Sequence, residues 1–208
     1  MTEQYPDYLF SRQDNAPDEV FYAAPRFATH IDDETIDAIT QFYRESFSAE
    51  HELLDLMSSW ISHLPPEMSF RKIAGLGMNQ EELDANPRLD ERRVQNLNKT
   101  PALPYADESF DAVMIAVSIQ YLIRPLEVFE EIARILKPEG KCIVIMSHRL
   151  FPTKAIYAFH ALGPADRFQL VRQYLAHGGL IDVEFIDRSP ESADPLWIIQ
   201  GTKPVKSG

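Results

Sequence analysis

Short apolar segments bounded by turn residues recur along this chain and predict β-strands. Most of them are continuous apolar runs, which is typical of strands buried on both faces of a parallel sheet. The predicted strands cover residues 51–56, 70–78, 92–97, 109–119, 141–147, 180–189 and 195–203.

Apolar residues spaced by three and four positions predict helices between these strands and before the first one. Either Asp32 or Asp33 can cap the first helix, because a short acidic side chain accepts hydrogen bonds from the free N–H groups there. Gly178 and Gly179 suit the end of the last helix. The predicted helices cover residues 30–47, 80–86, 125–136, 152–162 and 165–179.

Strands that alternate with helices predict the α/β class, here a doubly wound, mostly parallel sheet of seven strands. The last two strands are separated by residues 189–195, which carry no helical pattern and are too few for a parallel crossover. We therefore expect the sheet to close with an antiparallel strand pair.

The chain is expected to form one domain with two parts. Residues 1–50 form an N-terminal arm and helix, packed on a domain of residues 51–208. Residues 1–30 are too aromatic for a free tail. They are expected either to cover a functional site or to serve as a structural strap across the sheet.

The net charge of the 208 residues is −12 at pH 7, which disfavours a nucleic-acid or anionic-membrane partner because phosphate contacts need a basic face. The lone cysteine, Cys142, lies in a predicted strand and cannot form an internal disulfide. The start of the chain lacks the pattern of a signal peptide, and no apolar run is long enough to span a bilayer. These features predict a cytoplasmic protein.

Residues 103–147, LPYADESFDAVMIAVSIQYLIRPLEVFEEIARILKPEGKCIVIMS, resemble the second half of a class I S-adenosylmethionine-dependent methyltransferase of the small type 11 kind. In members of this family, the motif LPF-D-SFD is followed by an apolar strand, a helix, the motif R-LKPGG and a further strand. Here Glu139 replaces the first glycine of the second motif. DLMSSW, residues 55–60, and GLGMN, residues 75–79, further resemble an uncharacterised branch of these proteins. The resemblance implies a Rossmann-like methyltransferase fold and S-adenosyl-L-methionine as the cofactor.

In the resembled family an acid ends the first strand and a glycine-rich turn follows it. Asp55 stands at the position of the acid, and the glycine positions correspond to Met57, Ser59 and Ile61. The resemblance implies that Asp55, Met57, Ser58 and Ser59 contact the cofactor.

Two interpretations of this loop remain open. In one, Ser58 and Ser59 lie at a helix N-terminus, where their hydroxyls and free N–H groups hold the carboxylate of the methionyl moiety and Asp55 faces its ammonium. In the other, one serine only caps a short helix and Asp55 bonds to backbone. Pro65 and Pro66 limit this helix to barely more than one turn.

At the end of the second strand, Gly77 replaces the acid that binds the ribose in the family. The resemblance places Gly75, Gly77, Met78 and Asn79 near the ribose, with the Asn79 amide as the substitute for the acid. Alternatively, Asn79 caps the following helix and Glu82 completes a capping box.

At the end of the third strand, Asn96 replaces the acid that contacts the adenine amino group in the family, and an amide oxygen can accept the same hydrogen bond. Leu97 is expected either against the adenine face or in the core. Ser118 follows the fourth strand, where the family lines the methyl-transfer site.

Methyl transfer from a sulfonium relies largely on positioning, and an acceptor of high pKa also needs a general base. His148, after the fifth strand, and Tyr121, after the fourth, are candidate catalytic bases, and Arg149 is a candidate for holding an anionic substrate. The alternative is a loop histidine and a surface arginine. The histidines show no metal-ligand spacing, so no metal is predicted.

These observations predict an enzyme, an S-adenosylmethionine-dependent methyltransferase acting on a small-molecule substrate. The alternative is a catalytically inactive methyltransferase-like module for binding or assembly, with a protein partner. A nicotinamide-dependent oxidoreductase is disfavoured, because no G-x-G-x-x-G follows the first strand. An open, nucleoside-sized pocket at the ends of the first three strands favours the enzyme, and a pocket filled by Met57, Trp60 or Met78 favours the alternative.

Overall fold

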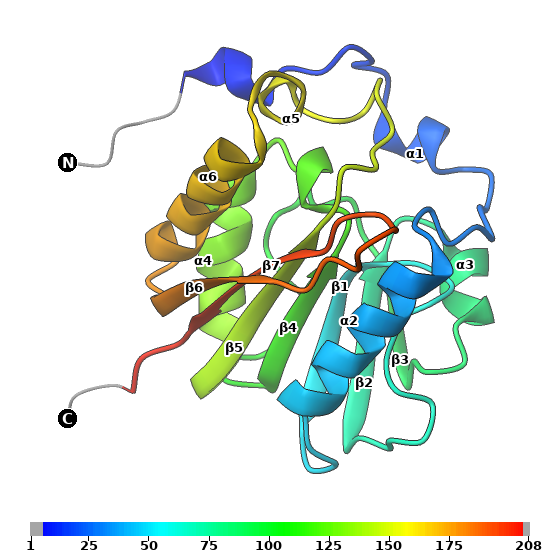
Figure 1. The fold of residues 1–208 in the computed structure, drawn as a ribbon, viewed down its shortest axis with the longest axis vertical. Coiled ribbons are helices and arrows are strands. Elements are labelled where there is room, and N and C mark those ends of the chain that lie inside the picture. The colour runs from blue at the N-terminus through cyan, green and yellow to red at the C-terminus, as the bar shows by residue number, and fades with distance from the viewer. Residues whose placement is uncertain (1–5, 206–208) are drawn as a thin grey trace.

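The computed structural model describes residues 6–205 as a seven-stranded sheet with helices on both faces (Figure 1). The strands are β1 (Glu52–Ser58), β2 (Lys72–Gly77), β3 (Glu91–Val94), β4 (Phe110–Ala116), β5 (Leu136–Met146), β6 (Ile181–Asp187) and β7 (Trp197–Thr202). The helices are η1 (Asp7–Phe10), α1 (Asp18–Phe21), α2 (Asp33–Ser46), α3 (Gln80–Ala85), η2 (Ile119–Tyr121), α4 (Pro125–Ile135), α5 (Tyr157–Ala161) and α6 (Pro164–His177).

The strand order is β3-β2-β1-β4-β5-β7-β6. β1 pairs in parallel with β2 and β4, whereas β7 pairs antiparallel with both β5 and β6. The predicted class is therefore confirmed: a doubly wound, mostly parallel sheet with a closing antiparallel pair. The order changes direction between β1 and β4, which is where open sheets of this kind form a crevice for ligands.

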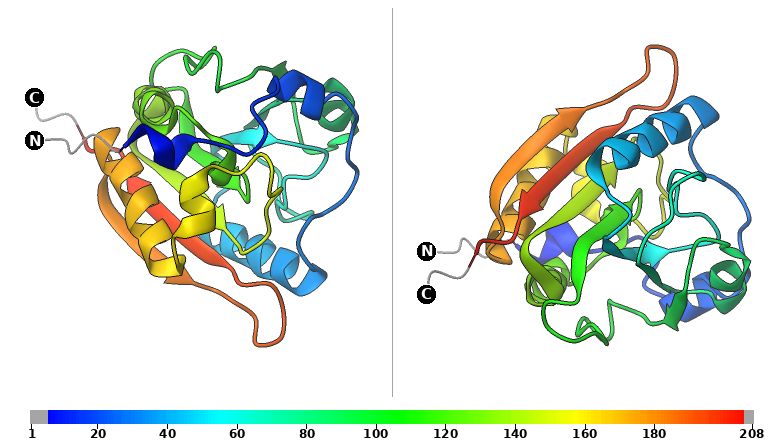
Figure 2. Two further views of the ribbon diagram at one scale, coloured as in Figure 1. Left: turned by 90° about the horizontal axis from the view of Figure 1, so that it is seen from above. Right: turned by 90° about the horizontal axis from the view of Figure 1, so that it is seen from below.

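Neighbouring residues of a strand face opposite sides of the sheet, and each side has its own hydrophobic core. In β1, Leu53 belongs to the core that contains Ile39 of α2, and Leu54 belongs to the core that contains Phe129 of α4. Figure 2 shows α2 on one face of the sheet and α4 and α6 on the other. Because both faces are covered, the edge at the carboxyl ends of the parallel strands is the part of the sheet left for a ligand.

Two predicted helix ends are confirmed. Asp32, and not Asp33, caps α2, because its carboxylate accepts the N–H of Thr35 at 2.9 Å. α6 ends at Gly178, and Gly179 follows with a φ of 82°, in the left-handed region that favours glycine. Within residues 6–205 no helix is both long and apolar enough to cross a membrane.

The helix predicted over residues 152–162 is wrong in its first half, because only Tyr157–Ala161 is helical. Lys154 turns into the protein instead. Its ammonium is completely buried and donates to the carbonyl of Ala16 at 2.7 Å. A tertiary contact here overrides the local helical pattern.

The short helix predicted directly after β1 is also wrong, because residues 59–71 contain none. Met57 and His63 have φ values of 61° and 55°, and left-handed residues of this kind interrupt a helix. Pro65 and Pro66 lack the N–H groups that a helix needs. The chain therefore passes from β1 to β2 as an irregular loop.

The arm, by which we mean residues 6–30, lies across the carboxyl ends of the parallel strands (Figures 1 and 2). Its backbone bonds to the body of the protein at several points: the N–H of Asp14 donates to the carbonyl of Thr153 at 2.9 Å, and the N–H of Tyr157 donates to that of Ser11 at 2.8 Å. Residues 1–5 of the predicted N-terminal part lie outside the described residues, and its division from the rest at residue 50 remains a prediction.

Candidate active site

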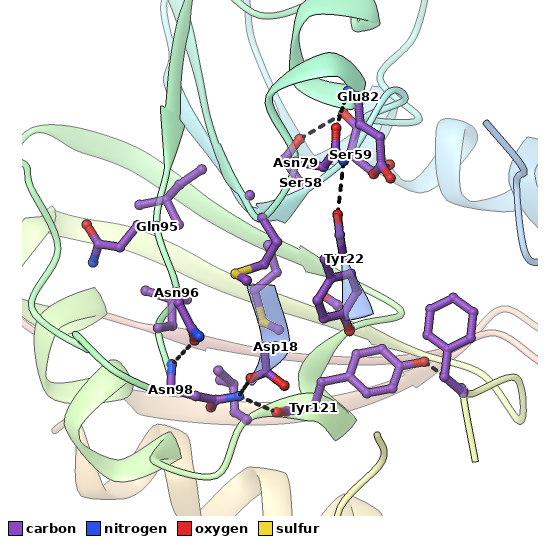
Figure 3. A pocket seen from close by; sticks show the side chains of 18 of the residues that line it. Asp18, Tyr22, Ser58, Ser59, Asn79, Glu82, Gln95, Asn96, Asn98 and Tyr121 are labelled. Carbon is purple, nitrogen blue, oxygen red and sulfur yellow. Dashed lines mark hydrogen bonds between the residues drawn. The ribbon is translucent and has the colours of Figure 1, made fainter. Parts of the chain in front are cut away.

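A pocket with an empty volume of about 920 Å³, part of it open to solvent, lies at the carboxyl ends of β1 to β4. The arm provides its opposite wall, including Asp18 and Tyr22 (Figure 3). The pocket is therefore formed between the ends of the strands and the arm.

The pocket brings together most of the site residues predicted from the sequence. Those that line it are Met57, Ser58, Ser59, Gly77, Met78, Asn79, Asn96, Leu97, Ser118 and Tyr121. Their contacts with a cofactor remain predictions. Asp55, Gly75 and the candidate base His148 do not line it, and the structure gives each of them a different environment.

Asp55 lies beneath the pocket and is 4% exposed. Its carboxylate accepts the hydroxyls of Ser58 and Ser62, each at 2.6 Å. Burial raises its pKa to about 6, although the two hydroxyl donors oppose the shift. Asp55 thus supports Ser58 and does not face the pocket. No helix begins at Ser58 or Ser59, so the interpretation that places a helix N-terminus there is wrong. The alternative is wrong too, because there is no helix for a serine to cap and Asp55 bonds to serine hydroxyls and not to backbone.

Gly75 and His148 also serve other contacts. A Cβ on Gly75 would lie 2.4 Å from the side chain of Leu89, so this glycine makes room for core packing. The Nε2 of His148 lies 2.9 Å from the buried carboxylate of Asp194, and Arg149 bonds to that same carboxylate at 2.9 Å. The structure therefore does not support His148 as a base or Arg149 as an anion-binding residue in this pocket.

The loop after β1 keeps the backbone of a glycine turn without a glycine. Met57 has a φ of 61°, and the pairing of β1 with β2 shifts register between Leu56 and Ser58. This bulge brings the carbonyl of Ser58 so close to β2 that a Cβ on Gly77 would lie 2.2 Å from its oxygen. Gly77 is needed for this approach, so no acid can stand at that position.

The acidic side chain in this part of the pocket comes instead from Glu82 of α3. It accepts the hydroxyl of Ser59 at 2.5 Å and the backbone N–H of Arg26 at 2.7 Å. Asn79 caps α3 by accepting the N–H of Glu82 at 3.1 Å, and its amide donates to the carbonyl of Tyr22 at 2.9 Å. The Asn79 cap is confirmed, but Glu82 does not complete a capping box, because its carboxylate accepts from Ser59 and Arg26 instead. Both Asn79 and Glu82 hold the arm (Figure 3).

Two asparagines after β3 connect the pocket to the arm. The side-chain oxygen of Asn96 accepts the N–H of Asn98 at 2.9 Å, and its amide donates to Glu19 at 3.0 Å. Asn98 donates to the carboxylate of Asp18 at 2.9 Å (Figure 3). Leu97, between them, is 4% exposed, so it belongs to the core and also borders the pocket.

A buried ion cluster fixes the arm in this position. Asp18 pairs with Arg12 at 2.8 Å and with the fully buried Lys154 at 3.3 Å. Lys154 also pairs with Asp14 at 3.1 Å. Two carboxylates therefore compensate two cations, as buried charges require.

The remaining wall of the pocket is largely aromatic. The rings of Tyr121 and Phe151 stack with their centroids 5.6 Å apart, and the Tyr121 oxygen accepts the N–H of Phe151 at 2.8 Å. Burial raises the pKa of Tyr121, so it is protonated near neutral pH and is not a base there. His30 packs edge-on against Phe151, and burial lowers its pKa. The buried hydroxyl of Ser118 has no hydrogen-bond partner among the residues described.

Sequence reasoning did not assign several polar residues of the pocket to the site, among them Asp18, Tyr22, Arg26, Glu82 and Asn98. The three of these that belong to the arm bond to residues 56 to 80 positions away. The high aromatic content of residues 1–30 was the signal that this segment packs against something.

Residues 58–144 match the family model described as a methyltransferase domain of type 11. The matched segment runs from the end of β1 into β5 and so includes the ends of the four strands β1 to β4 at the pocket. The match supports a class I S-adenosylmethionine-dependent methyltransferase of type 11, as the sequence predicts.

Two curated relatives match parts of the chain. The ubiquinone/menaquinone biosynthesis C-methyltransferase UbiE of Geotalea uraniireducens is 38% identical over 63 residues, 29% of this chain and 27% of that protein. A demethylmenaquinone methyltransferase of Lactobacillus johnsonii is 36% identical over 93 residues, 40% of this chain and 36% of that protein. The chain thus matches only 27% of the length of the first relative and 36% of the second.

A solved structure shows the same fold. Phosphoethanolamine N-methyltransferase 2 of Haemonchus contortus, in complex with S-adenosyl-L-methionine, has a TM-score of 0.60 at 14% identity, over 83% of this chain and 52% of that one. Identity this low establishes the fold alone. Neither the family model nor these relatives support the alternative of an inactive binding module.

S-adenosylmethionine is the cofactor of this family, and the residues of the pocket fit a nucleoside that carries an amino acid. Met57 and Met78 contribute to the wall without filling the pocket, and Trp60 lies outside its lining. Leu97 contributes an apolar side chain to the lining, and the buried hydroxyl of Ser118, also in the lining, has no hydrogen-bond partner among the described residues.

Proposed function

We propose that this protein transfers the methyl group of S-adenosylmethionine to a small-molecule acceptor. The observation that carries the proposal is the pocket at the carboxyl ends of β1 to β4, where the strand order changes direction. Most of the residues expected to contact the cofactor line this pocket, with the exception of Asp55 and Gly75, and the arm forms its opposite wall.

Asn96 and Leu97 are suited to an adenine base. An amide oxygen can accept a hydrogen bond from an exocyclic amino group, and a leucine side chain can pack against the face of the ring. Ser118 follows β4 and can donate its hydroxyl to the bound molecules. These residues orient the reactants, and orientation supplies much of the rate in an in-line displacement.

An acceptor that carries a proton needs a base in the same pocket, and His30 of the arm is the candidate that the structure favours. It lines the pocket, whereas His148 is bound to Asp194 outside it. The lowered pKa of His30 leaves its imidazole neutral at neutral pH, which is the state that accepts a proton.

We propose a small molecule as the methyl acceptor, and we name no single compound. The names of the two relatives refer to quinone methylation, but the chain matches at most 36% of either protein. A small molecule fits the enclosed pocket, and the net charge of −12 disfavours a nucleic acid.

The test is calorimetric titration with S-adenosylhomocysteine, the product form of the cofactor. Ser118→Trp fills the pocket, and Ser48→Trp makes the same change at an exposed position before β1. We expect micromolar binding by the wild type and by Ser48→Trp, and none by Ser118→Trp at an unchanged melting temperature. No heat from the wild type at millimolar ligand, or equal binding by both variants, would reject the proposal.

A further inference from the structure

The pocket has one cationic side chain that no carboxylate neutralises. Two arginines line the pocket within residues 6–205, Arg12 and Arg26. Arg12 is neutralised by Asp18 at 2.8 Å. The guanidinium of Arg26 forms no ion pair with any described residue, so its charge is available to a ligand.

The guanidinium of Arg26 is held by neutral groups. It donates to the carbonyls of Phe21 at 2.7 Å and Ala24 at 3.4 Å, and its centre lies 4.4 Å from the ring centroid of Phe21 and 5.4 Å from that of Phe151. These contacts fix its place but do not cancel its charge. A guanidinium has five N–H donors, so donors remain for an anion.

The two serines of the loop after β1 are poor partners for a ligand carboxylate. Each hydroxyl has a single proton, and both protons are already donated to carboxylates: Ser58 to Asp55 at 2.6 Å and Ser59 to Glu82 at 2.5 Å. The loop also lacks a helix N-terminus. A carboxylate placed there would meet two acids and no free donor side chain.

We propose that Arg26 binds the carboxylate of the amino-acid moiety of S-adenosylmethionine and that Glu82 faces its ammonium. This inference rests on the proposed function. Glu82 accepts the backbone N–H of Arg26 at 2.7 Å, and both side chains line the pocket, so its wall offers one acid and one unpaired cation to the two charges of a zwitterion. A guanidinium can bind a carboxylate through two parallel hydrogen bonds.

The test compares two ligands by calorimetry. S-adenosylhomocysteine and 5′-methylthioadenosine share the adenosine and the thioether, but the second lacks the amino acid. Arg26→Gln removes the charge, and Arg172→Gln makes the same change at an exposed position of α6, outside the pocket lining. We expect Arg26→Gln to weaken S-adenosylhomocysteine by about 10- to 100-fold, since charge-assisted pairs are the strong ones, and to change methylthioadenosine by less than about 2-fold.

Further variants keep the test decisive. Arg26→Lys retains the charge without the planar fork, so an intermediate affinity for S-adenosylhomocysteine is expected. Equal weakening of both ligands by Arg26→Gln would show that Arg26 only docks the arm, and unchanged affinity for both would place the carboxylate elsewhere; either result overturns the inference. A wild type that binds neither ligand would reject the proposed function itself and this inference with it.

Discussion

The carboxylate of Asp55 and the hydroxyl of Ser58 lie 2.6 Å apart, in the layer directly beneath the pocket. Ser58 lines the pocket, and Asp55 does not. Asp55, a buried acid of β1, therefore affects the pocket through its hydrogen bond with Ser58. Among residues 6–205, only hydroxyl groups donate to this buried carboxylate, so its charged form is costly, and this has a measurable consequence.

Asp55 should make the stability of the protein depend on pH. Its pKa is about 6 in the folded protein and about 4 in an unfolded chain, so its contribution to stability is full below about pH 4 and is lost as the pH rises through 6. The free energy of unfolding should therefore fall by about 1 kcal/mol more in the wild type than in Asp55→Asn between pH 5 and pH 8. Urea unfolding at the two pH values measures this difference.

The matched control is Asp37→Asn, at an exposed position of α2. It should retain the pH dependence of the wild type. If Asp55→Asn retains it as well, the carboxylate is not the group that titrates.

Gly77→Ala should destabilise the fold. The added Cβ would lie 2.2 Å from the carbonyl oxygen of Ser58, so the end of β1 must move. Overpacking of this kind costs about 1–3 kcal/mol, and the displaced Ser58 should also weaken the binding of S-adenosylhomocysteine. Denaturant unfolding and calorimetry measure the two effects.

Gly163→Ala is the control for Gly77→Ala, because a Cβ at Gly163 meets nothing within 4 Å. It should leave the free energy of unfolding within about 0.5 kcal/mol of the wild type. A Gly77→Ala protein as stable as Gly163→Ala would contradict the close approach of β1 to β2.

Lys154→Met should release the arm. The substitution leaves Asp14 without its 3.1 Å partner and Asp18 with only Arg12, and removing one partner from a buried ion cluster typically costs about 3–5 kcal/mol. Because the arm is aromatic, chymotrypsin should cut it faster in the variant, and S-adenosylhomocysteine should bind more weakly.

Lys141→Met provides the comparison for Lys154→Met, since Lys141 is partly exposed and forms no ion pair with residues 6–205. The arm of this variant should resist chymotrypsin as the wild type does. Equal cleavage of the two variants would show that the ion cluster does not hold the arm.

Local patterns were enough to predict most of the fold. All seven predicted strands are present. The continuous apolar runs belong to β1, β2, β4 and β5, which are mostly buried, whereas β3 and β6 are largely exposed. Asn79 and Glu82 carry a helix-start signature, and Asn79 does cap α3. Met57 in β1 and Glu139 in β5, with a φ of 64°, both keep left-handed backbone where the resembled family has glycine.

The candidate site was less predictable because its contacts join distant parts of the chain. The hydroxyl of Ser59 bonds to Glu82, 23 positions later, and Asn98 bonds to Asp18, 80 positions earlier. No spacing rule connects such pairs. Lys154 is a second example of a distant contact that the sequence does not reveal. The residues around it predict a helix, but its hydrogen bond to the arm holds Lys154 outside that helix.

The anchoring of the arm also bears on the order in which the protein can assemble. The carbonyl of Ala16 and the ammonium of Lys154 are 138 positions apart, so the arm leaves the ribosome long before its anchor is made. Closing so long a loop is slow compared with forming local contacts. The strand ends can therefore be in place while the arm is still undocked, and a nascent chain that stops short of Lys154 would present the strand side of the pocket uncovered.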